Sequence, residues 1–252
     1  MTQLSDYEHS YADIRFERDD GILCMTFHTD EGPLKWTERS HRELPQAFHD
    51  VATDPENRVV IMTGTGDDFL TELAFETRAQ SPTDWDKIVT EGIRMLDELM
   101  RIPVPVIAAV NGPVTEHAEV ALLSDIVLAS ETATFSDREH FVAGVVPGDG
   151  VHVVWPLLLG PNRGRHFLLT GRTLDASEAL HLGLVAEVLP RDQLMDRAWE
   201  LARELNRQTM LTLRYSRTCI TMQLRRDLEQ FLAEGLRLES LAAVDRRSHG
   251  GR

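Results

Sequence analysis

The chain has 252 residues, enough for one α/β domain with a large buried core, alone or with a helical appendage. Its formal charge is −15, from 26 Lys and Arg against 41 Asp and Glu, which would repel a phosphate backbone and argues against nucleic-acid binding. The two cysteines, Cys24 and Cys219, form no C-x-x-C pair, which excludes a disulfide framework and a thiolate metal site.

Targeting and membrane segments are not evident. Residues 1–20 are polar and contain no apolar stretch of the kind found in signal peptides. The most apolar candidate for a membrane segment, residues 102–110, is interrupted by two prolines and is too short to cross a bilayer. The sequence therefore predicts a cytoplasmic protein with no membrane contact.

The N-terminal part predicts a β-hairpin followed by a helix. Strand-like runs at residues 14–17 and 22–28 flank the turn residues Asp19, Asp20 and Gly21. Thr37 is placed to cap a helix that runs to about residue 52, because the apolar side chains beyond it recur at helical spacing.

The middle of the chain alternates between strands and helices. The predicted elements are strands at 59–62, 104–110, 126–129 and 133–135, and helices at 85–100 and 118–123. This alternation favours an α/β fold with a largely parallel sheet. Ligands of such folds bind at loops beyond the strand ends, so the loops after residues 62, 110 and 135 are the expected site.

Beyond residue 190 the pattern becomes helical. Residues 198–206 and 211–241 carry apolar side chains at helical spacing between many Arg and Glu. We therefore divide the chain into a catalytic core, residues 1–190, and a helical region, residues 191–252, that packs on the core or on a neighbouring subunit.

The sequence contains no complete motif for a cofactor or for a covalent nucleophile. Gly64 and Gly66 lack the third glycine of a dinucleotide fingerprint, and the carboxylates of Asp67 and Asp68 would repel a pyrophosphate. The sequence contains no phosphate-binding GKS or GKT loop, no G-x-S-x-G elbow and no H-E-x-x-H pair. Residues 116–119 contain a possible metal half-site, but adjacent turn residues do not face one ion well. We expect no cofactor and no metal.

An ordered set of segments resembles the crotonase (enoyl-CoA hydratase/isomerase) superfamily. In chain order the segments are VVIMTGTGDDF (59–69), PVPVIAAVNGPV (103–114), SDIVLASETATFSD (124–137), GVVPGDG (144–150) and GRTLDASEALHLGLVAEVLP (171–190). The resemblance implies the crotonase (ClpP-like) spiral fold of ββα units with a C-terminal helical oligomerisation region. It also implies a homotrimer or a dimer of trimers.

The departures from the family pattern concern the expected active site. His140 stands where hydratases of the family keep their second glutamate, and Asp149 replaces a small residue between two glycines. A carboxylate on one ring nitrogen fixes the imidazole tautomer, which leaves the other nitrogen to take a proton from water. Their spacing alone is a weak signal, and their position in the family pattern favours a functional pair.

The loops that form the family's oxyanion hole also differ. Residues 69–74 lack the usual glycine and aspartate, and residues 116–119 replace a glycine run. Without these glycines the backbone approaches a thioester less closely, so a CoA-thioester oxyanion hole is not supported. His117 and Trp36 could supply side-chain donors instead, although Trp36 could equally be a core aromatic.

Within the superfamily, five positions are similar to β-diketone hydrolases of the 6-oxocamphor hydrolase type: Trp36, His117, His140, Asp149 and Glu239. The similarity implies hydrolytic retro-Claisen cleavage of a small apolar cyclic 1,3-diketone to a keto acid. His140, oriented by Asp149, would activate water; His117 and Trp36 would hydrogen-bond the enolate oxygen; His140 or Glu239 would protonate the carbon.

One alternative is an enoyl-CoA hydratase or isomerase of the same fold. Glu119 aligns with the first glutamate of that class, but no dense Lys and Arg cluster for CoA phosphates borders the loops. A non-catalytic or nucleic-acid-binding relative is a second alternative, which the negative charge disfavours.

Overall fold

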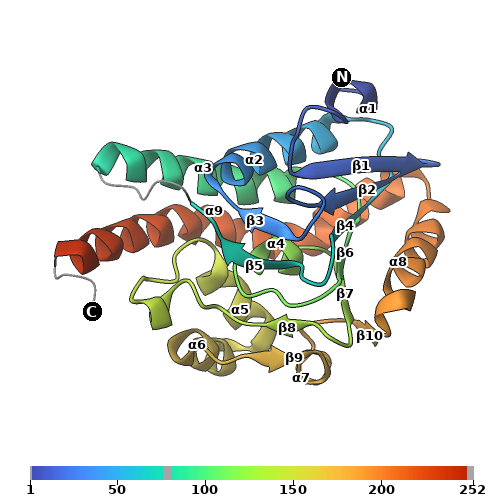
Figure 1. The fold of residues 1–252 in the computed structure, drawn as a ribbon. Helices are drawn as coiled ribbons and strands as arrows, with labels where there is room; N and C mark the ends of the chain where they lie inside the picture. The colour runs from blue at the N-terminus through green and yellow to red at the C-terminus, as the bar shows by residue number, and fades with distance from the viewer. Residues whose placement is uncertain (1, 76–80, 249–252) are drawn as a thin grey trace.

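A central sheet organises the computed structural model, which describes residues 2–75 and 81–248 and contains six strands in this sheet (Figure 1). In spatial order the strands are β1 (Ile14–Asp19), β2 (Ile22–Phe27), β4 (Val59–Gly64), β6 (Val106–Val110), β7 (Ile126–Ser130) and β10 (Glu187–Leu189). β1 and β2 are antiparallel, and every other neighbouring pair is parallel. The predicted hairpin and largely parallel sheet are confirmed.

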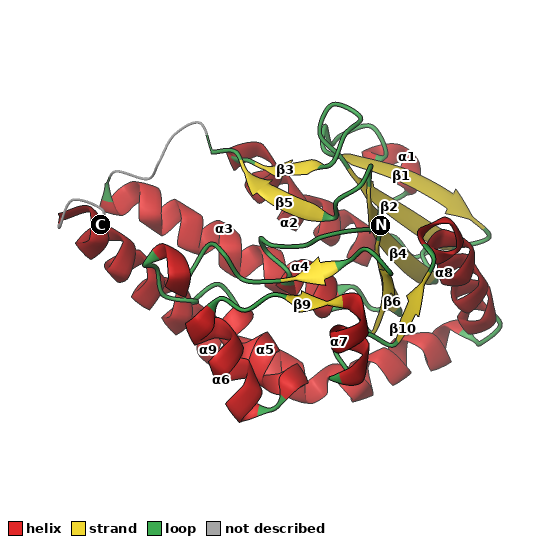
Figure 2. Cartoon of the chain, turned by 60° about the horizontal axis from the view of Figure 1, so that its bottom comes forward, coloured by secondary structure: helices red, strands yellow, loops and turns green. Residues whose placement is uncertain are grey.

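Short strands form a second layer beside this sheet (Figure 2). β3 (Leu34–Trp36) pairs with β5 (Leu70–Leu73), and β8 (Thr134–Phe135) pairs with β9 (Leu174–Asp175). The backbone of Val114, in the loop after β6, bridges to both Leu70 and Phe135. The loop that follows β6 therefore runs beside the loop that follows β8.

Two amphipathic helices, α2 (Glu38–Thr53) and α3 (Pro82–Arg101), pack against each other. The Thr37 side chain accepts a hydrogen bond from Ser40 N–H, as expected for a helix cap. α3 begins three residues before the predicted start, because Ser81 caps it and Pro82 suits its first turn. Shorter elements complete the core: α1 (Leu4–Tyr7), α4 (Glu119–Leu122), the 3-10 turn η1 (Phe141–Ala143), α5 (Val151–Leu159), α6 (Pro161–Thr170) and α7 (Ala176–His181).

The C-terminal part is helical, as predicted, and consists of α8 (Arg191–Asn206) and α9 (Met210–Ser248). α8 buries Leu194, Ala198 and Ala202 against one face of the sheet. α9 packs along α3 and against α5, on the other side of the molecule in Figure 1. The boundary placed at residue 190 stays a prediction, since both helices pack on elements that precede it.

None of the helices in the described part of the chain combines the length and the apolar character needed to cross a membrane.

Candidate active site

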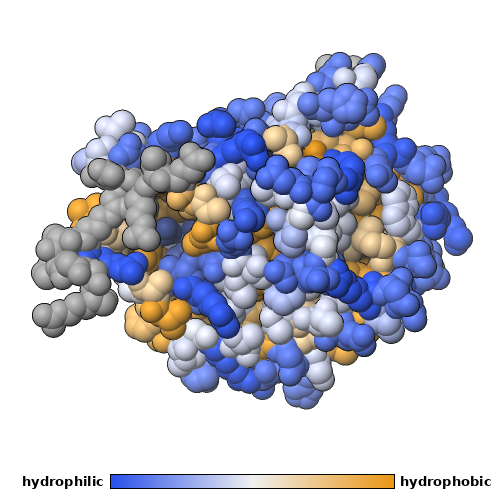
Figure 3. Space-filling view, in the orientation of Figure 1, coloured by the Kyte–Doolittle hydropathy of each residue, from blue (hydrophilic) through white to orange (hydrophobic). Residues whose placement is uncertain are grey.

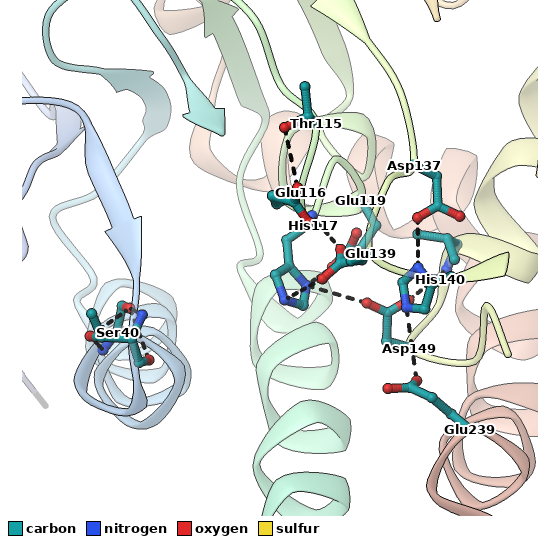
Figure 4. Close-up of polar contacts among 12 residues, drawn as sticks. Ser40, Thr115, Glu116, His117, Glu119, Asp137, Glu139, His140, Asp149 and Glu239 are labelled. Atoms are coloured by element: carbon teal, nitrogen blue, oxygen red, sulfur yellow. Dashed lines mark hydrogen bonds and ion pairs between the residues drawn. The ribbon is translucent and has the colours of Figure 1, made fainter. Parts of the chain in front are cut away.

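A cavity of about 520 Å³ lies between α3, α9 and the loops that follow β6 and β8. Two of the three loops expected from the sequence, those after residues 110 and 135, contribute to it. Its apolar wall and its polar wall are formed by His41, Leu73, Phe75, Trp85, Ile88, Gly92, Met95, His117, Glu139, His140, Val145, Asp149, Leu236, Glu239, Ala243 and Arg246. The polar groups come from separate elements and converge on one side (Figure 4).

Backbone pairing between the two loops positions the polar wall. Ser136 N–H donates to the Val114 carbonyl at 3.1 Å, and Arg138 N–H donates to the Thr115 carbonyl at 3.3 Å. At the next position the bond is made by a side chain instead of the backbone: Glu139 Oε1 accepts from the backbone N–H of His117 at 2.8 Å. His117 has a φ of 45°, a left-handed conformation that is unusual for a residue other than glycine. The Glu139 bond helps to hold it there.

His140 is buried among three carboxylates. Its Nδ1 lies 2.6 Å from Asp137 Oδ1, a short hydrogen bond, and its Nε2 lies 3.4 Å from Asp149 Oδ1 and 4.0 Å from Glu239 Oε2. Asp149 thus contacts His140 as expected, at Nε2, while Asp137 makes the shorter bond, at Nδ1. The orienting role assigned to Asp149 from the sequence stays a prediction.

Asp149 lies between two imidazoles. Its Oδ2 is 3.3 Å from Nδ1 of His117, which also contacts Glu119 Oε1 at 2.9 Å. On the opposite edge of the same ring, Nε2 lies 3.4 Å from Glu139 Oε2. Both nitrogens of His117 thus face carboxyl oxygens, and the ionised Asp149 among them favours the imidazolium form with two N–H donors.

Trp36 lies behind His117 rather than at the cavity. The two rings stack with their centroids 4.1 Å apart, and the Trp36 side chain is fully buried and does not line the cavity. Its indole N–H has no hydrogen-bond partner among the described residues. The role of this N–H as a donor to the substrate oxygen stays a prediction; the pairing of β3 with β5 places the indole against the imidazole.

The sequence profile of the enoyl-CoA hydratase/isomerase family matches residues 17–250. The chain belongs to that family, the crotonase superfamily. Among solved structures, a β-diketone hydrolase from the cyanobacterium Anabaena sp. PCC 7120, bound to (S)-3-oxocyclohexyl acetic acid, is 46% identical, with a TM-score of 0.94 over 96% of this chain and 98% of that chain. An enoyl-CoA hydratase/isomerase from Mycobacterium paratuberculosis is 25% identical, with a TM-score of 0.85 over 92% of this chain and 93% of that one.

A carnitinyl-CoA dehydratase from Citrobacter koseri is 37% identical over 167 residues. The match covers 65% of this chain and 63% of the dehydratase, so it spans less than two thirds of that protein's length. These relatives agree on the crotonase fold, which the sequence resemblance had implied, and their names point to different substrates.

Charge interactions shift the ionisation of the histidines and of Asp149. Burial disfavours the charged form of His140, but the carboxylates of Asp149, Glu139 and Asp137 outweigh it and raise its pKa well above 6.5. Burial likewise disfavours the charged form of His117, but the nearby carboxyl groups of Glu139 and Glu119 outweigh burial and raise the pKa of His117 well above 6.5. Burial also opposes ionisation of Asp149, yet both imidazoles hold its pKa below the usual range.

Two carboxyl groups of this crotonase shift in the opposite direction. Burial raises the pKa of Glu239 to about 8, and the nearby charge of Asp149 adds to the effect. Burial likewise raises the pKa of Glu139 to about 8. Both are therefore largely neutral acids near pH 7, beside an ionised Asp149. A base, a carboxylate and two acids within one cavity allow proton transfer in both directions.

Asp137, Glu139 and His41 belong to the site although no role was predicted for them from the sequence. Asp137 and Glu139 stand in segments already singled out, three residues and one residue before His140, so proximity to that histidine was the available signal. His41 lines the cavity from α2 and hydrogen-bonds Glu91 of α3 through Nδ1 at 2.9 Å. Only the packing of α2 on α3 brings it there, and no local pattern marks it.

Three sets of side chains in the described part of the chain are close enough to hold a cation: His117, Glu139 and Asp149; Asp137, Glu139 and His140; His140, Asp149 and Glu239. In each set the ligand atoms lie within 4.8 Å of one another. Nδ1 of His140 and both nitrogens of His117 face carboxyl oxygens directly, at 2.6 to 3.4 Å, and that geometry suits N–H donors. A cofactor-free site stays a prediction.

Proposed function

We propose that this crotonase is a β-diketone hydrolase that cleaves a C–C bond of a cyclic 1,3-diketone to give a keto acid. The observation that carries the proposal is its 46% identity, over 96% of its length, to the Anabaena β-diketone hydrolase. The cluster of His117, His140, Asp149 and Glu239 supports it, because it supplies a base, charge-stabilising donors and an acid in one cavity.

The ligand of that relative indicates a substrate. Joining the carboxyl carbon of 3-oxocyclohexyl acetic acid to the ring carbon on the other side of its ketone, away from the side chain, with loss of water, gives bicyclo[2.2.2]octane-2,6-dione. A cavity of about 520 Å³ with Leu73, Phe75 and Trp85 on its apolar wall suits a compact molecule of this kind. We propose a bicyclic 1,3-diketone as substrate.

The first step is attack by water. Nδ1–H of His140 donates to Asp137, which leaves Nε2 to take a proton from water as the oxygen attacks one carbonyl carbon. Asp149, 3.4 Å from Nε2, stays ionised and stabilises the imidazolium that forms. This is base catalysis without a covalent intermediate.

The second step breaks the C–C bond. The attacked carbonyl becomes the carboxyl group, and the electron pair moves onto the neighbouring ketone to form an enolate. His117, held as an imidazolium that lines the cavity, hydrogen-bonds the enolate oxygen. Glu239, a neutral acid 4.0 Å from His140 Nε2, protonates the carbon and regains its proton from His140.

The carnitinyl-CoA dehydratase match favours a second candidate, a CoA-thioester hydratase or isomerase. Its acid or base would be Glu119. In this structure the Glu119 side chain is fully buried, hydrogen-bonds His117 and does not line the cavity. That arrangement suits a support for His117 better than a group that touches a thioester.

A paired assay separates the two candidates. Purified protein is given bicyclo[2.2.2]octane-2,6-dione and, in parallel, crotonyl-CoA, with product detection by chromatography. We expect keto-acid formation from the diketone and no hydration of the thioester. Turnover of crotonyl-CoA with an untouched diketone would overturn the proposed function and favour the second candidate.

A further inference from the structure

Glu139 presents its two carboxyl oxygens to different partners. Oε1 accepts the backbone N–H of His117 at 2.8 Å, and Oε2 lies 3.4 Å from Nε2 of the same residue. Glu139 lines the cavity, although only 10% of its side chain is exposed. Both residues line the cavity, so Oε2 of Glu139 and Nε2 of His117 are neighbouring polar atoms of its wall.

An enolate oxygen is best stabilised by more than one preorganised donor. His117 lines the cavity and provides one, whereas the fully buried Trp36 does not line the cavity. We propose that Glu139 is the second donor: as a carboxylic acid, its Oε2–H and Nε2–H of His117 together hydrogen-bond the oxygen on which the enolate charge develops. The inference rests on the proposed diketone cleavage.

The hydrogen bond from the His117 backbone indicates which oxygen of Glu139 carries the carboxyl proton. Oε1 already accepts from a backbone N–H, so it is the oxygen that benefits from remaining unprotonated. The proton is then carried by Oε2, on the side of Nε2 of His117. In this state Glu139 donates to an anion, whereas an ionised Glu139 would repel it.

The surroundings keep the acid neutral. The charged and titratable groups around Glu139 and its partner His117 come from several elements. They are Glu116 and His117 in the loop after β6, Glu119 on α4, Asp137 and His140 after β8, Asp149 before α5, His41 on α2, and Glu239 and Arg246 on α9. Burial raises the pKa of Glu139, and the charges of Asp149 and Glu116 add to the rise, which the two neighbouring imidazoles only partly offset. A buried acid kept neutral in this way can donate a hydrogen bond at neutral pH.

Substitution by glutamine tests the role directly. In Glu139→Gln the amide oxygen can still accept from His117 N–H, and the amide NH₂ replaces the Oε2–H donor. We expect kcat on the bicyclic diketone to stay within about tenfold of wild type, while Glu139→Ala loses about 10²- to 10³-fold. Glu131→Gln, at an exposed site after β7, is the matched control and should leave kcat unchanged.

The outcomes are distinguishable. A Glu139→Gln variant as inactive as Glu139→Ala, with both folded by circular dichroism, would show that the carboxylate charge is needed and would overturn the inference. Wild-type protein that leaves the diketone intact would instead overturn the proposed function.

A second measurement, the titration of the Glu139 carboxyl group, does not depend on catalysis. Carbon-13 NMR of the glutamate carboxyl carbons, with the Glu139→Gln spectrum as assignment, should show Glu139 titrating at about 8. Titration near the ordinary value of 4.5 would mean an ionised Glu139 at neutral pH and would contradict the proposed donor role.

Discussion

At the scale of single residues, Asp137 distinguishes this site from a simple His140–Asp149 pair. Its carboxylate makes the shortest contact to the catalytic imidazole, 2.6 Å at Nδ1, and fixes the tautomer that leaves Nε2 as the base. Asp149 faces Nε2 and so stabilises the protonated form. The two carboxylates therefore perform different tasks on one ring.

We predict that Asp137→Asn lowers kcat on the diketone by about 10²- to 10⁴-fold, since an amide can hold the wrong tautomer. Asp67→Asn, at an exposed ion pair with Arg191, is the control and should leave the rate unchanged. Steady-state kinetics on both variants provides the measurement. An unimpaired Asp137→Asn would remove Asp137 from the mechanism.

The pH dependence of kcat/KM on the diketone should report the ionisation of the His140 imidazole. The base must be neutral to act, and the surrounding carboxylates outweigh burial and raise the pKa of His140 well above 6.5, so kcat/KM should rise with pH above that value. It should fall again as Glu239 and Glu139 lose their protons at about pH 8. Asp149→Asn removes one of the charges around His140 and should move the rising part of the profile to lower pH. If the rising part of the kcat/KM profile stays at the same pH in Asp149→Asn, a group other than His140 is responsible for it.

At the scale of elements, the contact between the turn before α5 and α9 sets the position of Glu239. The backbones of Gly148 and Gly235 approach so closely that a Cβ on Gly235 would overlap the Gly148 carbonyl oxygen and the ring of His152. Glu239 lies about one helical turn beyond Gly235. The close contact between Gly148 and Gly235 thus sets the distance between Glu239 on α9 and His140.

We predict that Gly235→Ala displaces α9, reduces kcat by at least about tenfold and destabilises the fold by about 1–3 kcal/mol through overpacking. Glu234→Ala, the exposed neighbour on the same helix, should change neither quantity appreciably. Kinetics and thermal unfolding measure the two effects. A fully active Gly235→Ala would mean that the contact does not position Glu239.

At the scale of the whole molecule, α9 carries apolar side chains that the chain itself does not cover. Exposed examples are Leu211, Tyr215, Ile220, Met222, Phe231, Leu238, Leu241 and Val244. The face in Figure 3 is mostly hydrophilic, and apolar groups on it gather toward the end where α3 begins and α9 ends. Such a surface favours association between copies of the chain.

We predict a homotrimer or a dimer of trimers. Size-exclusion chromatography with light scattering should give three or six times the chain mass of 28.5 kDa. Ile220→Asp should weaken the assembly if this surface forms the interface. A monodisperse monomer at micromolar concentration would contradict the prediction.

Folding stability should depend on pH through the buried acids. The pKa values of Glu139 and Glu239 rise from 4.5 to about 8 in the fold, so the folded state binds these protons more tightly than the unfolded chain. Their contribution is complete below about 4.5 and is lost as pH rises through about 8. We expect Tm to fall between pH 6 and 9, and to fall less in a Glu139→Gln, Glu239→Gln double variant. An equal slope in both proteins would contradict the raised pKa values.

Periodicity and turn chemistry predicted the hairpin, β4 and α3, because each of these elements has a strong pattern of its own. β3 and β5 were missed, since strands of three and four residues have too little periodicity to detect. That omission left the full burial of Trp36 unpredicted, because Trp36 belongs to β3, which pairs with β5.

Family-specific positions located the cavity, and His117, His140, Asp149 and Glu239 do converge there. The hydrogen bond from His140 to Asp137 depends on the side-chain conformation of an irregular loop, which spacing does not determine. Contacts of this kind become visible only when the loops after β6 and β8 are paired in space.

The most direct test of the proposed diketone cleavage is the rate at which purified protein converts bicyclo[2.2.2]octane-2,6-dione to 3-oxocyclohexyl acetic acid, compared with the rate of His140→Ala. We expect steady keto-acid formation by the wild-type protein. We expect a loss of at least about 10²-fold in the variant, with an unfolding transition that shows the variant is folded. Equal rates for both proteins, or no keto acid from either, would contradict the proposed cleavage.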